Sequence, residues 1–183
     1  MKSLKVFWIG FFALTIAGVL LGCQRTDTQS PDVSSSLRKS LDQAGLKDVS
    51  VSQDRDKGVV TLGGHVAADA DRAQAEGIAK AIAAGQVVAD QIAVIPAGDA
   101  SAAKAMNADL DSGIEKNLDA VLIQYGLHKN VKYGVKNGVV TLTGDVSSNS
   151  ARAQAEQIAT SVPNVRQVVN ELQSKNQKAT SSN

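Results

Sequence analysis

Apolar and polar positions recur in the same order in two stretches of the chain, and the second stretch shows the pattern most clearly. One helical face is predicted there from apolar residues spaced i, i+4, i+7, i+8 and i+11, namely Ile114, Leu118, Val121, Leu122 and Tyr125. Residues 131–135 then alternate like a strand, and 139–142 return after an Asn-Gly pair that suits a tight hairpin turn. A second helix over 151–162 and a final strand over 165–172 complete the unit.

The first stretch repeats this order, and parts of it repeat the letters. GVVTLGGHV at Gly58–Val66 is a near copy of GVVTLTGDV at Gly138–Val146, and RAQAE occurs at Arg72–Glu76 and at Arg152–Glu156. Both pairs are separated by 80 residues. The sequence therefore predicts an α+β fold of two tandem α-β-β-α-β domains, each a three-stranded mixed sheet with two helices on one face. The predicted domains are residues 31–95 and 111–173.

The segments that flank these domains are polar or rich in small residues. Residues 96–110 are either a linker or an extension of the next helix, for which Ser112-x-x-Glu115 fits a capping box. Ser30-Pro31-Asp32 is a start signal for the first helix. Residues 174–183 predict a disordered tail. Near Ala83–Gln91 the first copy departs from the second by one residue lost at the turn and one gained in the strand, which predicts a β-bulge.

The N-terminus has the layout of a secretory signal peptide over residues 1–22. Lys2 and Lys5 precede an uncharged apolar run, which Leu20-Leu21-Gly22-Cys23 closes. This ending resembles a bacterial lipobox, so Cys23 is the predicted lipidation site and residues 23–30 a lipidated tether. An uncleaved membrane anchor is the alternative, but the run is shorter than the ~20 apolar residues that a span needs. The residue after Cys23 is not Asp, which by resemblance to enterobacterial sorting favours the outer membrane.

The order of elements, with G-V-V-T-L-x-G-x-V, R-A-Q-A-E and V-R-Q-V-V-N-E-L, resembles the BON domain of bacterial osmotic-stress and envelope proteins. A lipobox followed by two such domains is similar to dual-BON outer-membrane lipoproteins. The resemblance implies a non-enzymatic, periplasm-facing envelope protein that associates with anionic phospholipid and supports outer-membrane integrity. One departure is that Trp8, the only tryptophan, lies in the predicted signal peptide, so deep interfacial insertion through an aromatic side chain is not expected.

Composition excludes several function classes. Without residues 1–22 the chain keeps 17 basic and 18 acidic side chains and two aromatic residues, Tyr125 and Tyr133. Nucleic-acid binding, which uses a basic surplus and stacking aromatics, is therefore not expected. Cys23 is the only cysteine, so no disulfide is expected. We find no nucleophile, base and acid grouping and no histidine pair at metal-ligand spacing, so neither an enzyme nor a metal or other cofactor is predicted.

Three shared or isolated features have structural interpretations. The paired glycines, Gly58/Gly138 and Gly64/Gly144, fit a hairpin turn and a sharp exit into the next helix. Arg and Glu at i, i+4 within each RAQAE motif fit a solvated ion pair. His65 is predicted to be an exposed loop residue.

The candidate binding site lies in the second copy, because charge divides unevenly between the halves: −3 for residues 23–100 and +2 for residues 101–183. The candidate phospholipid-binding residues are Lys116, Tyr125, His128, Lys129, Lys132 and Lys136. An ordinary solvated lysine face is the alternative. For the whole protein, the rival function is an adaptor that docks envelope proteins through an exposed sheet edge.

Overall fold

The computed structural model describes residues 29–98, 100–174 and 178–182. The predicted signal peptide, Cys23 and nearly all of the predicted tether lie outside the described residues. Within the described part of the chain, no helix combines the length and the apolar character needed to cross a membrane.

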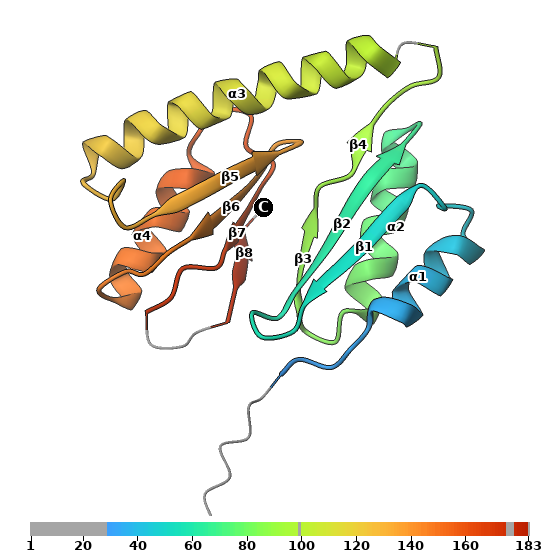
Figure 1. The fold of residues 1–183 in the computed structure, drawn as a ribbon, viewed down its shortest axis with the longest axis horizontal. Coiled ribbons are helices and arrows are strands. Elements are labelled where there is room, and N and C mark those ends of the chain that lie inside the picture. The colour runs from blue at the N-terminus through green and yellow to red at the C-terminus, as the bar shows by residue number, and fades with distance from the viewer. Residues whose placement is uncertain (1–28, 99, 175–177, 183) are drawn as a thin grey trace, which may run out of the picture.

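Domain 1 contains two helices on one face of its sheet (Figure 1). Its elements are α1 (Ser34–Gln43), β1 (Val49–Asp54), β2 (Val59–Val66), α2 (Asp69–Ile82), β3 (Val87–Asp90) and β4 (Ala93–Val94). Strand β2 is central: it pairs with β1 antiparallel and with both β3 and β4 in parallel. Leucines and valines of the strands meet Leu37, Leu41, Ala75 and Ala79 of the helices in one core.

Domain 2 repeats this architecture and adds one strand. Its elements are α3 (Ala100–Gln124), β5 (Lys132–Lys136), β6 (Val139–Thr143), α4 (Asn149–Thr160), β7 (Gln167–Asn170) and β8 (Thr180–Ser182). The sheet order is β5-β6-β7-β8, with only the β6–β7 pair parallel. The predicted mixed α+β fold with paired helices on one face is confirmed in both domains.

Strands β3 and β7 pair with the central strands of their domains in the same register, which corrects the prediction of a β-bulge in domain 1. Val60 pairs with Val88 in domain 1, as Val140 pairs with Val168 in domain 2. The register continues unchanged to the pair His65 and Ala93, so domain 1 has no β-bulge between β3 and β4. The two copies therefore align over this strand without a gap, and Asp90 is the equivalent of Asn170.

Two predicted helix starts are wrong. Helix α1 begins at Ser34, where the Asp32 carboxylate accepts hydrogen bonds from the Ser34 backbone N–H at 3.0 Å and from its hydroxyl at 2.7 Å. Helix α3 begins at Ala100, so most of the 96–110 segment is a helical extension and Ser112 lies inside the helix. The alanines of this segment favour helix without needing a local cap.

Shared glycines adopt conformations that other residues disfavour. Gly64 and Gly144 have φ of 83° and 119°, and a Cβ there would lie 2.0 Å and 2.2 Å from a backbone carbonyl oxygen. Asn137 and Gly138 turn the β5–β6 hairpin with φ of 49° and 76°. Both of their backbone N–H groups donate to the Asp111 carboxylate of α3. The hairpin interpretation is therefore confirmed, whereas Gly64 lies within β2 and Gly144 directly follows β6, so this pair allows close approach of a neighbouring carbonyl instead of an exit into the helix.

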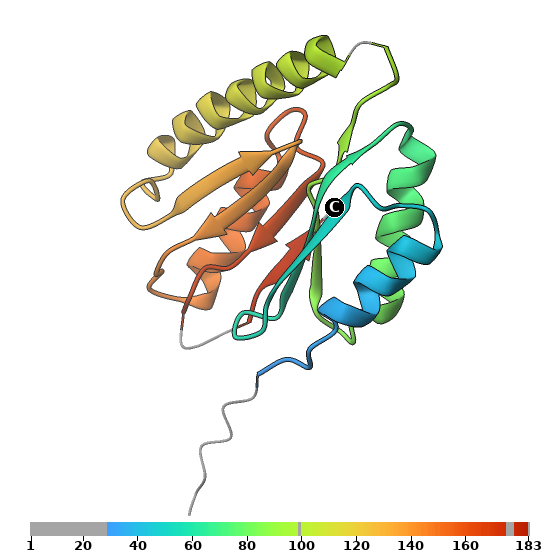
Figure 2. The same ribbon diagram turned by 45° about the vertical axis from the view of Figure 1, so that its right-hand side comes forward.

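The two sheets face one another, with the helices on the outer sides (Figures 1 and 2). Strand β3 lies against β7 and β8. A small apolar core between the domains joins Val59 and Ala89 of domain 1 to Val139, Val169 and Ala179 of domain 2. The prediction of a disordered tail is wrong for residues 178–182, because β8 pairs with β7 and Ala179 is buried in this core.

Candidate functional site at the outer strand edges

The repeated RAQAE motif holds the edge strand of domain 2, because Arg152 lies under it rather than in solvent. Arg152 is only 8% exposed. Its guanidinium donates to the carbonyl oxygens of Leu172 at 2.9 Å and Asn170 at 2.7 Å, both within domain 2. It also donates to the Lys178 carbonyl at 3.0 Å and to the Thr180 hydroxyl at 3.2 Å. The predicted solvated ion pair is therefore wrong here, and Arg152 joins the domain to its C-terminal strand.

Glu156, one helical turn further along α4, completes this contact. Its carboxylate accepts from the Asn170 side-chain amide at 2.8 Å, from the Thr180 hydroxyl at 3.0 Å and from the Ser182 hydroxyl. Burial alone would raise the pKa of Glu156, but these hydrogen bonds and the nearby Arg152 charge outweigh it, so its pKa is lowered. The charged carboxylate is therefore the form that holds β8.

The C-terminal segment also contacts domain 1. The Ala179 backbone N–H donates to the Lys57 carbonyl at 3.0 Å, and the Lys178 ammonium donates to the buried Ser30 hydroxyl at 2.8 Å. Lys57 itself forms an ion pair with Glu171 of domain 2 at 2.6 Å, which raises the pKa of Lys57. The last residues thus connect domain 2 to the point at which the chain enters domain 1.

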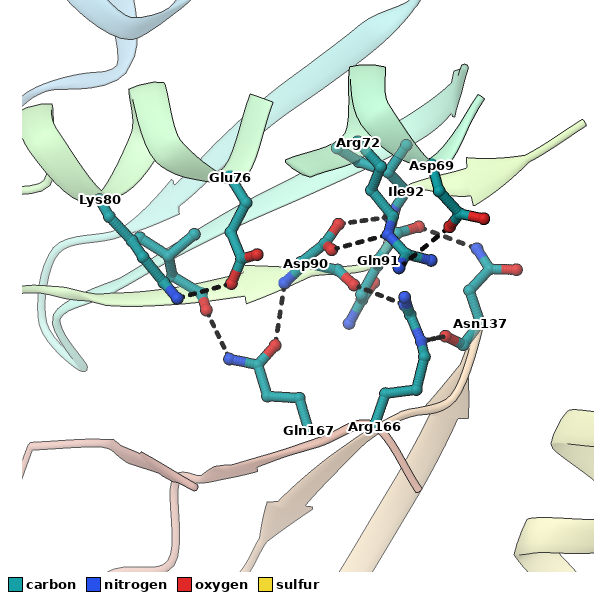
Figure 3. Close-up of polar contacts among 11 residues, drawn as sticks. Asp69, Arg72, Glu76, Lys80, Asp90, Gln91, Ile92, Asn137, Arg166 and Gln167 are labelled. Carbon is teal, nitrogen blue, oxygen red and sulfur yellow. Dashed lines mark hydrogen bonds and ion pairs between the residues drawn. The ribbon is translucent and has the colours of Figure 1, made fainter. Parts of the chain in front are cut away.

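The equivalent edge of domain 1, along β3, is covered by side chains instead of a strand (Figure 3). The Gln167 amide accepts from the Asp90 backbone N–H at 3.0 Å and donates to the Val88 carbonyl at 2.7 Å, as a neighbouring strand would. Arg166 donates to the Asp90 carbonyl at 3.2 Å, and the Asn137 amide donates to the Gln91 carbonyl at 2.8 Å. Domain 2 therefore closes the β3 edge.

Charged groups gather beside this edge around Asp90. The Asp90 carboxylate lies 3.5 Å from Arg72, which also pairs with Asp69 at 3.2 Å, and Glu76 pairs with Lys80 (Figure 3). Burial raises the pKa of Asp90 against the opposing effects of the Ile92 backbone N–H and the two arginines. Burial also lowers the pKa of Arg166. The predicted Arg72–Glu76 ion pair is thus replaced by other partners.

A polar cavity of about 150 Å³ lies within this cluster. It is small beside the roughly 300–1,000 Å³ of typical ligand sites. Among the described residues, no group of three or more His, Cys, Asp and Glu side chains is placed to hold a metal ion. The cluster is best understood as a contact between the domains.

The structure divides the predicted phospholipid site between two faces of domain 2. Tyr133 and Val135 pack toward the helices, so Lys132 and Lys136 point to the opposite face of the sheet. Lys116 is exposed on α3, on the helical side. Lys136 adjoins the hairpin turn next to domain 1, whereas Lys132 lies at the other end of β5, near the end of α3. Lys116, Lys132 and Lys136 therefore do not form one cluster.

The remaining predicted residues lie together where α3 ends and β5 begins. Tyr125 is 53% exposed, and His128 and Lys129 are exposed in the same connection. Ile123, which the sequence reasoning missed, is 52% exposed in the last turn of α3. The sequence could have indicated this exposure, because Ile123 falls outside the apolar face of its helix. We call residues 123–132 at this end of domain 2 the α3–β5 end.

Domain 1 has different residues at the equivalent place. Leu41 and Leu122 are equivalent, because the carbonyl of each accepts a hydrogen bond from the leucine five residues later. Ile123 therefore corresponds to Asp42, and Tyr125 to Ala44. The loop that follows in domain 1 contains Lys47 and Asp48. Of these two equivalent ends, the α3–β5 end is the one that combines exposed apolar side chains with a basic loop.

Comparisons with known proteins agree with this repeat. A model of the BON domain matches residues 29–96 and 110–176. Osmotically-inducible protein Y of Escherichia coli (strain K12) is 30% identical over 135 residues, which cover 74% of this chain and 67% of that protein.

Solved structures of CdsD, a structural protein of the type III secretion system of Chlamydia trachomatis, match more distantly. One is 14% identical with a TM-score of 0.28 and covers 78% of this chain and 60% of its own. The other, its C-terminal domain, is 17% identical with a TM-score of 0.31 and covers 77% and 96%. These scores are too low to support an argument about function. The two family matches span most of the described residues, and the chain therefore belongs to the BON domain family, with two copies of the domain in tandem.

Proposed function

We propose that this protein is a non-enzymatic envelope lipoprotein that faces the periplasm, is anchored in the outer membrane through Cys23, and contacts anionic phospholipid through domain 2. Its function is to support outer-membrane integrity under stress. The name of its relative, osmotically-inducible protein Y, supports the link to osmotic stress.

The observation that carries the phospholipid proposal is the composition of the α3–β5 end. Ile123 and Tyr125 are about half exposed in the same short segment as the exposed His128 and Lys129. Apolar side chains next to basic ones suit the boundary between lipid headgroups and acyl chains. Each lysine near an anionic surface contributes about 1 kcal/mol. The lipid anchor strengthens this contact further, because the second contact of a tethered protein is intramolecular.

The test is co-flotation of the chain from Gln24 to Asn183 with vesicles, without its lipid anchor. We expect binding to anionic vesicles at low salt, loss of binding at high salt, and no binding to neutral vesicles. Lys129→Glu should weaken binding about tenfold or more, since it reverses a charge at the contact. Tyr125→Ser should weaken it also, without changing the salt dependence.

Lys116→Glu and Lys136→Glu are matched controls, because each makes the same change in charge away from the α3–β5 end. Equal losses in all three lysine variants would mean that binding follows net charge alone. No binding under any condition would contradict the proposed membrane contact of domain 2.

A further inference from the structure

We propose that the β7 edge of domain 2 is a binding site for an extended strand of a partner protein, and that the chain's own β8 occupies this site in cis. The partner segment has a small residue followed by hydroxyl residues, as in the chain's own Ala179-Thr-Ser-Ser182. This inference does not depend on phospholipid binding, and it gives the adaptor function a defined site.

The side chains around the β7 edge recognise features of the strand that lies on it. Arg152 binds a backbone carbonyl and the Thr180 hydroxyl, and Glu156 binds the Thr180 and Ser182 hydroxyls. The Gln167 amide donates to the Ser181 hydroxyl at 2.8 Å. Three residues of the domain thus contact three consecutive side chains of the strand. Strand addition combines main-chain pairing with such side-chain contacts.

Arg152 and Glu156 form part of their hydrogen bonds with β8. Arg152 is nearly buried, and without β8 it would lose two of its four hydrogen bonds. Glu156 would keep only the Asn170 amide. A strand that pairs with β7 restores these hydrogen bonds, whereas water takes the place of the lost partners when β8 is displaced and no other strand lies there.

The strand β8 itself is short, and hydrogen bonds from both domains hold its segment. It has three residues, Thr180 and Ser181 are exposed, and its segment buries one small apolar side chain, that of Ala179. Most of its attachment is hydrogen bonding, which contributes about 1 kcal/mol per bond net of water. A partner strand that makes the same bonds competes with β8, and the cis strand has the advantage of high effective concentration.

In domain 1, side chains of the other domain cover the equivalent edge. There the Gln167 amide pairs with the β3 backbone, and Arg72 turns to Asp69 and Asp90. Among the described residues, a strand of its own domain therefore covers the β7 edge, whereas side chains of the other domain cover the β3 edge.

The test uses a labelled peptide of the last six residues, KATSSN, in fluorescence anisotropy titrations against the chain from Gln24 onward. Ser181→Pro removes a backbone N–H from the middle of β8 and disfavours its pairing. We expect this variant to bind the peptide at least tenfold more tightly than the unmodified chain does. Ser181→Ala, which preserves the strand, is the matched control and should behave as the unmodified chain. The same peptide with Ser181→Pro should not bind.

Adding Glu156→Gln to the opened chain should weaken peptide binding again, because the carboxylate that accepts two strand hydroxyls is lost. Amide exchange of β7 and β8 shows whether Ser181→Pro has displaced β8. If it has not, Ala179→Glu, which places a carboxylate in the apolar core between the domains, is used instead. Absence of peptide binding in a chain with β8 displaced, or equal affinity for opened and unmodified chains, would overturn the proposal. Neither result depends on vesicle flotation.

Discussion

The same five letters, RAQAE, act differently in the two domains. In domain 2, Arg152 is buried and holds the terminal strand β8. In domain 1, Arg72 is 27% exposed in its side chain and pairs with Asp69 and Asp90. The difference follows from what covers each outer strand: a strand over β7, and side chains of domain 2 over β3. The repeated motif therefore occupies the same place in each domain but contacts different partners. Both of the proposed binding sites lie in domain 2.

The largest effect should come from a feature that both copies share. Gly64→Ala and Gly144→Ala each place a Cβ about 2 Å from a backbone carbonyl oxygen, so each should destabilise its domain by about 4 kcal/mol. Gly134→Ala, with no atom within 4 Å of the added Cβ, is the matched control. Urea denaturation measures the loss. A strong effect in one copy alone would show that the scaffolds are not equivalent.

The next largest effect should differ between the two domains, because their equivalent arginines have different contacts. Arg152→Ala leaves the Leu172 and Asn170 carbonyls without this donor and should cost about 3 kcal/mol of unfolding free energy. Arg72→Ala should cost under about 1 kcal/mol, because its ion pairs are partly exposed. Denaturation of both variants under the same conditions compares them. Equal losses would contradict the different roles of the two arginines.

Loss of the side chain that covers the β3 edge of domain 1 should lower the unfolding free energy by a smaller amount. Gln167→Ala removes the amide that pairs with Val88 and Asp90, which should cost about 2 kcal/mol and increase exchange of the Asp90 amide. Gln154→Ala, on an exposed position of α4, serves as the control. Hydrogen exchange followed by NMR provides the measurement. An unchanged Asp90 amide would mean that the Gln167 side chain does not close this edge.

Much of the domain scaffold was predictable, whereas the contacts between domains were not. Apolar periodicity and the repeated letters locate the helices, the hairpins and the positive-φ glycines, because these depend on local sequence. Strand β8 was missed because its small polar residues have no apolar alternation. Its order comes from Arg152 and Glu156, which are distant in sequence. The burial of Arg152 was missed because an i, i+4 Arg-Glu pair is the same pattern on an exposed helix.

The candidate membrane site was predicted only in part. Basic residues near Tyr125 were identified from charge and spacing. Their division between two faces depends on the direction of α3 across the sheet, which no local pattern specifies. Ile123 has no local signal of a binding role beyond its position off the apolar helical face.

The smallest predicted effect is opposite pH dependence at the two edges. The pKa of Glu156 is lowered from 4.5, so its contribution to stability is present above that value and lost as pH falls through its folded pKa. The pKa of Asp90 is raised from 3.8, so its contribution is present below that value and lost as pH rises through its folded pKa.

Stability measured between about pH 3 and about pH 6 tests these signs. Relative to the unmodified chain, Glu156→Gln should become less stable as pH rises and Asp90→Asn more stable. The change for Glu156→Gln should stay below about 1 kcal/mol, because solvent screens its partly exposed carboxylate. Slopes of the same sign would contradict the assigned environments.

The most direct test of the proposed membrane role places a tryptophan at equivalent positions of the two domains. The chain from Gln24 has no tryptophan of its own, so Ile123→Trp reports on domain 2 and Asp42→Trp on domain 1. With anionic vesicles at low salt, we predict a blue shift of emission and protection from acrylamide quenching for Ile123→Trp alone. High salt should remove both changes. No change at Ile123→Trp, or the same change at both positions, would contradict the assignment of membrane contact to the α3–β5 end of domain 2.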